Sequence, residues 1–181
     1  MIHPEVLLRP SRPADLGAIT AIYRESVIHG TGTFELEAPD EAEMARRRND
    51  VLTNGLPWLV LKKRGDVVGY AYANHFRPRR AYRFCVENSV YLAADAQRQG
   101  LGRLLLAELM ARCEAAGARQ MLAVIGDSAN IGSIRVHQAL GFEPVGTLKA
   151  AGWKLGRWLD VVMMQRSLGF GAATEPIDPP A

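Results

Sequence analysis

The segment that most constrains the fold of this chain joins a short apolar strand to a helix through two glycines. The predicted strand is Val90-Tyr91-Leu92, and residues 97–103, here called the glycine loop, read QRQGLGR. Glycine lets the backbone approach a ligand closely. The first N–H groups of a following helix have no intrahelical partner and carry partial positive charge. The segment therefore predicts either a pyrophosphate site or an ordinary tight connection with solvated arginines.

Length, charge and cysteine content limit the classes of function. The 181 residues suit one domain, and 48% apolar residues can supply its core. A net charge of +3 with scattered arginines predicts no nucleic-acid partner. Cys85 and Cys113 predict neither a disulfide framework nor a metal site. No signal peptide follows Met1 and no apolar run could span a membrane, so we expect a cytoplasmic protein without a membrane partner.

Hydrophobic periodicity predicts a mixed α/β sheet with helices. We expect helices over about 16–29, 40–54, 100–116 and 130–140, and strands over 6–10, 58–62, 67–74, 82–92, 121–125, 142–147 and 158–166. The step from strand 82–92 through a helix to strand 121–125 predicts one parallel pair. The chain reads as a single domain over 1–168, and its glycine, alanine and proline content from residue 169 predicts a disordered tail.

The glycine loop, the element order and a second helix start at Asn130-x-x-Ser133 together resemble the GNAT superfamily of acetyl-CoA-dependent N-acetyltransferases. The resemblance covers residues 6–168. It implies an α/β GNAT fold with a mixed, mostly antiparallel sheet of about seven strands flanked by about four helices. Within the superfamily, the chain resembles the phosphinothricin and the methionine sulfoximine or sulfone acetyltransferases at residues 81–83, 86–91, 122–126, 133–142, 148–154 and 156–160.

This resemblance implies a homodimeric enzyme that transfers an acetyl group from acetyl-CoA to the α-amine of a small amino-acid analogue. The implied acetyl-CoA contacts are Val90, Tyr91, Leu92, Arg98, Gln99, Gly100, Leu101, Gly102, Arg103, Asn130 and Ser133. The implied substrate contacts are Phe34, Arg77, Pro78, Arg79, Arg83, Asn88 and Ser89. An open strand edge would hold the amide-bearing arm of the cofactor, and the helix start would hold its pyrophosphate.

Glu87 is the predicted catalytic base. An α-ammonium group must lose a proton before its nitrogen can attack a thioester. Glu87 lies on the polar face of the strand before the glycine loop, and the resemblance assigns it as the base, directly or through water. From the residues alone, a surface carboxylate or an ion pair with Arg83 explains Glu87 as well.

His137 shares one helical stripe with Asn130 and Ser133. Many GNAT enzymes carry a tyrosine acid at this place, which predicts that His137 donates a proton to the departing thiolate or contacts the amine. A helix histidine packed against a backbone carbonyl explains the same pattern.

Arginines before Glu87 are the predicted partners of the acceptor's carboxylate and second oxyanion, because a guanidinium grips such groups with two hydrogen bonds. Arg77 matches the family's arginine, whereas Arg80 is expected to be a solvated loop charge. Phe34 lines the pocket or joins the core. Trp153 and Trp158 line the site or the dimer contact.

Two differences from these relatives leave the identity of the substrate undecided. Cys85 stands where they commonly have threonine, and the loop 74–76 differs in sequence from theirs. A protein α-amine acetyltransferase is an alternative function, and it needs an open groove for a peptide. A non-catalytic acetyl-CoA-binding module is another, and Glu87 and His137 weigh against it.

Overall fold

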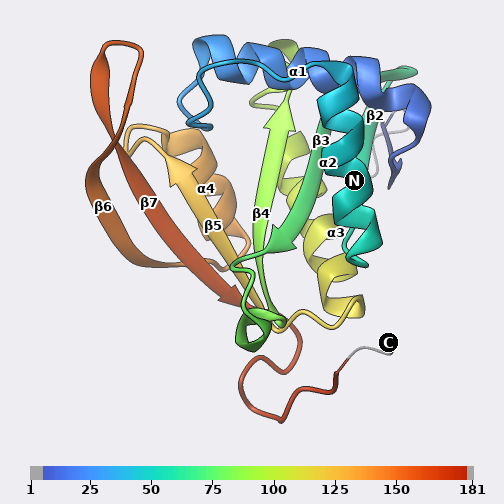
Figure 1. The fold of residues 1–181 in the computed structure, drawn as a ribbon, viewed down its shortest axis with the longest axis vertical. Helices are drawn as coiled ribbons and strands as arrows, with labels where there is room; N and C mark the ends of the chain where they lie inside the picture. The colour runs from blue at the N-terminus through green and yellow to red at the C-terminus, as the bar shows by residue number, and fades with distance from the viewer. Residues whose placement is uncertain (1–5, 179–181) are drawn as a thin grey trace.

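A twisted seven-stranded sheet runs through the middle of the molecule, with helices on both faces (Figure 1). The computed structural model describes residues 6–178. The strands are β1 (Val6–Pro10), β2 (Trp58–Lys63), β3 (Asp66–His75), β4 (Cys85–Leu92), β5 (Gln120–Gly126), β6 (Glu143–Lys154) and β7 (Arg157–Ser167). They lie in the order β1-β2-β3-β4-β5-β7-β6, and only β4 and β5 are parallel. The predicted mixed, mostly antiparallel sheet is confirmed.

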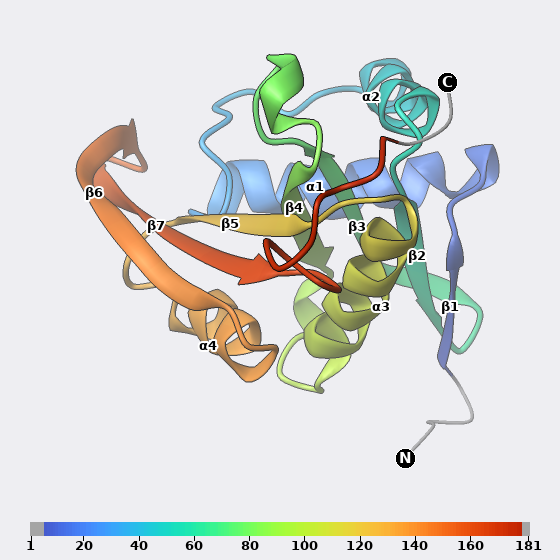
Figure 2. The same cartoon turned by 90° about the horizontal axis from the view of Figure 1, so that it is seen from below.

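The helices form two layers, which Figure 2 shows from the end of the sheet. They are α1 (Leu16–His29), α2 (Glu41–Thr53), α3 (Leu101–Ala115) and α4 (Ile131–Ala139). The pair α1 and α2 covers one face of the sheet, and α3 and α4 cover the other. The Asp40 carboxylate caps α2, since it accepts the Glu43 N–H at 2.8 Å. No helix among the described residues is long and apolar enough to cross a membrane.

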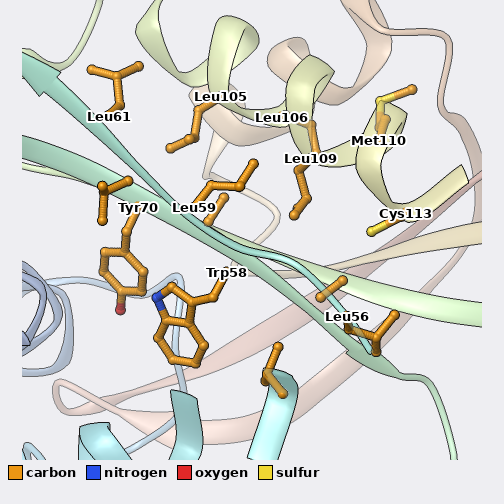
Figure 3. Packing of buried hydrophobic residues seen from close by; sticks show 14 of the residues in the cluster. Leu56, Trp58, Leu59, Leu61, Tyr70, Leu105, Leu106, Leu109, Met110 and Cys113 are labelled. Atoms are coloured by element: carbon orange, nitrogen blue, oxygen red, sulfur yellow. The ribbon is translucent and has the colours of Figure 1, made fainter. Parts of the chain in front are cut away.

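Strand β2 is buried on both faces and joins the two layers of the core. Figure 3 shows Leu105 and Leu109 of α3 on one side of this strand, and Trp58 and Tyr70 on the other. All four side chains are at most 1% exposed. Burying an apolar side chain of this size stabilises the fold by roughly 1.5–3 kcal/mol. Strand β3 pairs with this buried strand and β4 pairs with β3, so the tightly packed core holds both strands in place.

Strands β4 and β5 separate halfway along their length. They pair only where Cys85 to Asn88 lie opposite Gln120 to Ala123. Beyond this point β5 remains paired with β7, and β4 remains paired with β3. Among the described strands, none pairs with the β5-facing edge of residues 89–92. We call the point of separation after Asn88 the fork, and it leaves an open backbone edge inside the sheet.

Two predicted strand boundaries are wrong. The strand predicted over 82–92 begins at Cys85, because Arg80–Tyr82 form a 3-10 turn. The strand predicted over 142–147 continues as β6 to Lys154, with an irregular register between Leu148 and Gly152. The longer strand makes the β6–β7 hairpin that projects away from the helices in Figure 1.

The segment after β7 runs back past the end of the sheet where β4 begins (Figure 1). Arg119 donates hydrogen bonds to the carbonyls of Gly171 and Thr174, both at 3.0 Å. Asp178 pairs with Arg83. The disorder predicted from residue 169 stays a prediction, and residues 179–181 lie outside the described residues.

Candidate functional site

The glycine loop forms an open turn in front of α3. Gly100 is the residue that caps the helix, and its φ of +78° is a left-handed value that glycine adopts without strain. The Leu104 N–H donates to the Gly100 carbonyl at 3.2 Å and closes the first turn. The N–H groups of 101–103 therefore lie where the helix offers no carbonyl. This helix start suits an anion.

Cations surround this helix start. Arg98, with φ of +57°, and Arg103 are both exposed on the loop. Gln99 accepts a hydrogen bond from the Lys63 ammonium at 2.5 Å and donates to the Asp95 carbonyl at 2.6 Å. Lys63 thus adds a positive charge from the end of β2. Sequence reasoning missed it, because the contact spans 36 positions.

Strand β4 presents different side chains to the two layers of helices. Tyr91 faces α1, because its ring lies 5.0 Å from the ring of Tyr23. Side chains alternate along a strand, so Ser89 and Glu87 face the same layer. Asn88, predicted as a substrate contact, faces the opposite layer instead, where its side chain contacts His137 of α4. The predicted base and the predicted proton donor therefore lie on opposite faces of the sheet.

Glu87 is a half-buried carboxyl group beside the loop that follows β3. Burial raises the pKa of Glu87 above its ordinary value, and the nearby Arg77 guanidinium opposes this shift. Arg77 is exposed and stacks on Phe76, with 4.7 Å from its guanidinium carbon to the ring centre. A carboxylate of raised pKa is suited to accept a proton near neutral pH.

The other loop arginines are arranged differently. Arg83 stacks on Phe84 at 4.3 Å and pairs with Asp178, so the structure does not form the alternative ion pair with Glu87. Arg80 lies 3.9 Å from the same Asp178 carboxylate. Pro78 and Arg79 are exposed on the loop. Of the predicted substrate arginines, Arg77 is the one whose charge acts on Glu87.

Tyr72 is a neighbour of this site that sequence reasoning missed. Ser89 lies directly opposite Tyr72 on β4. Burial raises the pKa of Tyr72, and Glu87 adds to the rise. The sequence could have identified Tyr72, because Tyr70 and Tyr72 are two positions apart on β3 and such side chains share one face of a strand.

The loop between α1 and α2 packs against β5 and β6, where an added Cβ at Gly126 would meet Thr31 and Phe34. Phe34 packs so closely on β6 that a Cβ added to Gly152 would lie 2.3 Å from its ring. The Thr33 carbonyl accepts a hydrogen bond from the buried Lys154 ammonium at 2.7 Å. The Thr33 hydroxyl lies 2.9 Å from the Tyr23 hydroxyl. Sequence reasoning missed the Lys154 contact, which ties the loop to the end of β6.

The start of α4 lies on the other side of the fork. The Asn130 side chain accepts the Ser133 N–H at 3.3 Å and donates to the Gly126 carbonyl at 3.5 Å, so it caps α4 against the end of β5. His137 is 4% exposed. Its Nδ1 lies 2.8 Å from the Ser133 carbonyl and its Nε2 lies 3.0 Å from Asn88 Oδ1. Burial lowers the pKa of His137, and the Ser133 contact opposes the shift.

Taken together, the structure places a cationic helix start, an open strand edge and a half-buried carboxylate along one strand and the loop that follows it. Trp153 and Trp158 lie apart from this line on the β6–β7 hairpin, where their rings meet edge to face at 5.3 Å. Within residues 6–178, no group of three or more His, Cys, Asp and Glu side chains could hold a metal ion.

Comparisons with known proteins agree with this geometry. The acetyltransferase (GNAT) family matches residues 19–142. A phosphinothricin N-acetyltransferase of Alcaligenes faecalis is 52% identical over 169 residues, which cover 93% of this chain and 86% of that protein. An L-methionine sulfoximine/L-methionine sulfone acetyltransferase of Pseudomonas aeruginosa is 38% identical over 162 residues, 89% of this chain and 94% of the relative.

A solved structure shows the same fold. It is a GNAT superfamily phosphinothricin acetyltransferase from Sinorhizobium meliloti in complex with AcCoA, with a TM-score of 0.93 and 52% identity. The similarity covers 96% of this chain and 94% of that one. The chain therefore belongs to the GNAT family of acetyltransferases, and it is an N-acetyltransferase that uses acetyl-CoA as its acetyl donor.

Proposed function

We propose that this enzyme acetylates the α-amine of a small anionic amino-acid analogue such as phosphinothricin, methionine sulfoximine or methionine sulfone. The observation that carries the proposal is the half-buried Glu87 beside Arg77, next to the open edge of β4. The names of the relatives at 52% and 38% identity support this class of acceptor.

In the proposed reaction, Glu87 accepts a proton from the α-ammonium group, directly or through one water. The neutral amine then attacks the acetyl carbonyl, and the nitrogen–carbon bond forms as the carbon–sulfur bond breaks. The second proton that the nitrogen loses passes to the departing CoA thiolate, which leaves as the thiol. Burial favours this role, because it raises the pKa of Glu87 and brings its proton affinity closer to that of an amine. Acetyl-CoA supplies the acetyl group as a thioester when bound.

The residues that would hold acetyl-CoA suit its chemistry. The backbone edge of Val90, Tyr91 and Leu92 can pair with the amide groups of a pantetheine arm. The N–H groups of the glycine loop at Gly100 to Arg103, with Arg98 and Gln99 before them, can receive the pyrophosphate. Asn130 and Ser133 lie across the fork at the start of α4.

The residues that would hold the acceptor surround Glu87. Arg77 is the proposed partner of an acceptor oxyanion, because its charge already acts on Glu87. Ser89 and Phe34 would line the pocket on the same face of the sheet. We keep Pro78 and Arg79 as proposed rim contacts, since both are exposed on the preceding loop.

An acceptor panel tests this function. Acetyl transfer is followed as CoA release with phosphinothricin, methionine sulfoximine, methionine sulfone and a short peptide with a free N-terminus. We expect turnover with at least one analogue and a much lower kcat/KM with the peptide. Good activity on the peptide alone would overturn the substrate class, and acetyl-CoA binding without any turnover would favour the non-catalytic module.

We also propose a homodimer. Strand β6 is an edge strand whose side chains are largely exposed, including Val145, Leu148 and Trp153. A long apolar edge favours association with another chain. Sedimentation should give twice the chain mass of 19.9 kDa, and a Trp153→Asp variant should sediment as a monomer. A monomeric unmodified protein would contradict the proposal. The cytoplasmic location stays a prediction.

A further inference from the structure

The side chain of Asn88 closes the fork between β4 and β5. Asn88 is the last β4 residue that pairs with β5, and it is 6% exposed. Its Nδ2 donates a hydrogen bond to the Leu122 carbonyl of β5 at 2.9 Å. A side-chain amide thus links the two strands at the place where their backbones begin to separate.

His137 holds this amide from the α4 side. Because the Asn88 NH2 group is turned toward Leu122, its Oδ1 faces the ring, and His137 Nε2 must donate across the 3.0 Å contact. His137 Nδ1 lies 2.8 Å from the Ser133 carbonyl. A protonated ring satisfies both contacts, and a neutral ring with its proton on Nε2 satisfies the contact with Asn88.

We infer that His137 is a positioning residue that fixes the fork through Asn88, and with it the open β4 edge and the orientation of the adjacent Glu87. The catalytic part of this inference rests on the proposed function. The buried ring lies on the face of β4 opposite Glu87 and its Nε2 proton is held by Asn88 Oδ1, so the geometry favours this role over proton donation to a thiolate.

The physical consequence of losing this link is a local one. Removing the ring leaves Asn88 Oδ1 buried without its donor, and such a group costs about 1–3 kcal/mol unless it reorients. Reorientation of the amide would break its hydrogen bond to Leu122. The strands could then shift relative to one another just where the open edge begins. A shift of this kind should affect acetyl-CoA affinity and turnover more than it affects global folding.

The test compares three variants that separate donation, packing and titration. His137→Ala removes the donor. His137→Gln restores an N–H group that can reach Asn88 Oδ1 but cannot act as an acid. Phe142→Leu is the packing control, because the buried Phe142 ring meets the His137 ring edge to face at 4.9 Å and has no group that could hydrogen-bond to Asn88.

Each variant is measured for melting temperature, acetyl-CoA affinity by calorimetry, and kcat against pH. For His137→Ala we expect acetyl-CoA affinity and kcat each to fall roughly 10-fold, because small misplacements near reacting groups are costly. For His137→Gln we expect both to return to within about threefold of the unmodified enzyme with the pH profile unchanged. Phe142→Leu should lower the melting temperature alone.

Two results would overturn the inference. A His137→Gln variant as slow as His137→Ala, with the alkaline limb of the pH profile lost, would make His137 the proton donor. A His137→Ala variant with normal affinity and kcat would make the contact structural only. The calorimetric measurement needs no acceptor, so it still tests the fork if the enzyme turns over none of the proposed substrates.

A double-mutant cycle provides a second measure. If His137 acts through Asn88, the combined His137→Ala and Asn88→Ala variant should bind acetyl-CoA no more weakly than Asn88→Ala alone. Additive losses would show that the two residues act separately and would contradict the inference.

Discussion

The two ends of the site are built in different ways. The end at the glycine loop comes mainly from one continuous stretch, in which β4 leads through residues 93–99 into α3. The end at Glu87 is assembled from the α1–α2 loop, β3, β4, the loop 76–84 and the hairpin strand β6. A change at the first end should therefore act on acetyl-CoA alone, whereas a change at the second should act on the acceptor and on proton transfer.

The fork lies between these two ends and belongs to both. Glu87 and Asn88 are adjacent in sequence, yet their side chains enter different layers of the molecule. Strand β4 thus carries the proposed proton acceptor, Glu87, on one face. On the other face it carries Asn88, which links the strand to β5 and α4. The following predictions test whether the two ends behave independently.

The largest effect is expected for Glu87→Gln. The amide keeps the size of the side chain but cannot take a proton, so kcat should fall roughly 10²- to 10⁴-fold. Acetyl-CoA affinity should stay within about twofold, because Glu87 lies away from the glycine loop. Steady-state kinetics measures kcat, and calorimetry measures the acetyl-CoA affinity. A large loss of acetyl-CoA affinity would show that the two ends are coupled.

A smaller effect is expected for the arginines. Arg77→Ala should raise the acceptor KM about tenfold, which corresponds to the loss of one charge-assisted hydrogen bond. Arg83→Ala is the matched comparison, because Arg83 is paired with Asp178 instead. It should change the acceptor KM by less than about twofold. Equal effects of both substitutions on KM would contradict the assignment of Arg77.

The smallest effect is expected at the glycine loop. Gly100 and Gly117 flank the two ends of α3, and both have left-handed φ angles with no atom within 4 Å of an added Cβ. Alanine at either position should cost about 1 kcal/mol of stability. Only Gly100→Ala should also raise the KM for acetyl-CoA, by about fivefold if the strain disturbs the helix start. A similar rise of the acetyl-CoA KM in Gly117→Ala would contradict the assignment of the glycine loop as the acetyl-CoA site.

The contrast between the two ends also explains what could be predicted from the sequence. The glycine loop and the caps at Asp40 and Asn130 depend on residues within a few positions of one another, so their local pattern is readable. The single parallel pair, β4 with β5, followed from the strand–helix–strand step through α3. These features needed no knowledge of long-range packing.

The acceptor end could be predicted only in part. The polar face of β4 identified Glu87, but the contacts of Lys154 with Thr33 and of His137 with Asn88 span 121 and 49 positions. No local pattern reports such contacts, because they are created by tertiary packing. The start of β4 was misplaced for a related reason. Alternation at 82 and 84 looked like a strand, whereas the chain forms a 3-10 turn at Arg80–Tyr82.

The most direct test of the account is the pH dependence of kcat with the best acceptor of the panel. Burial raises the pKa of Glu87, so activity should fall as the pH drops through a value above that of an ordinary glutamate. This acidic limb should disappear in Glu87→Gln. It should move to higher pH in Arg77→Ala, because that substitution removes the charge that opposes the shift. An identical limb in the unmodified enzyme and in Glu87→Gln would contradict the assignment of Glu87 as the base.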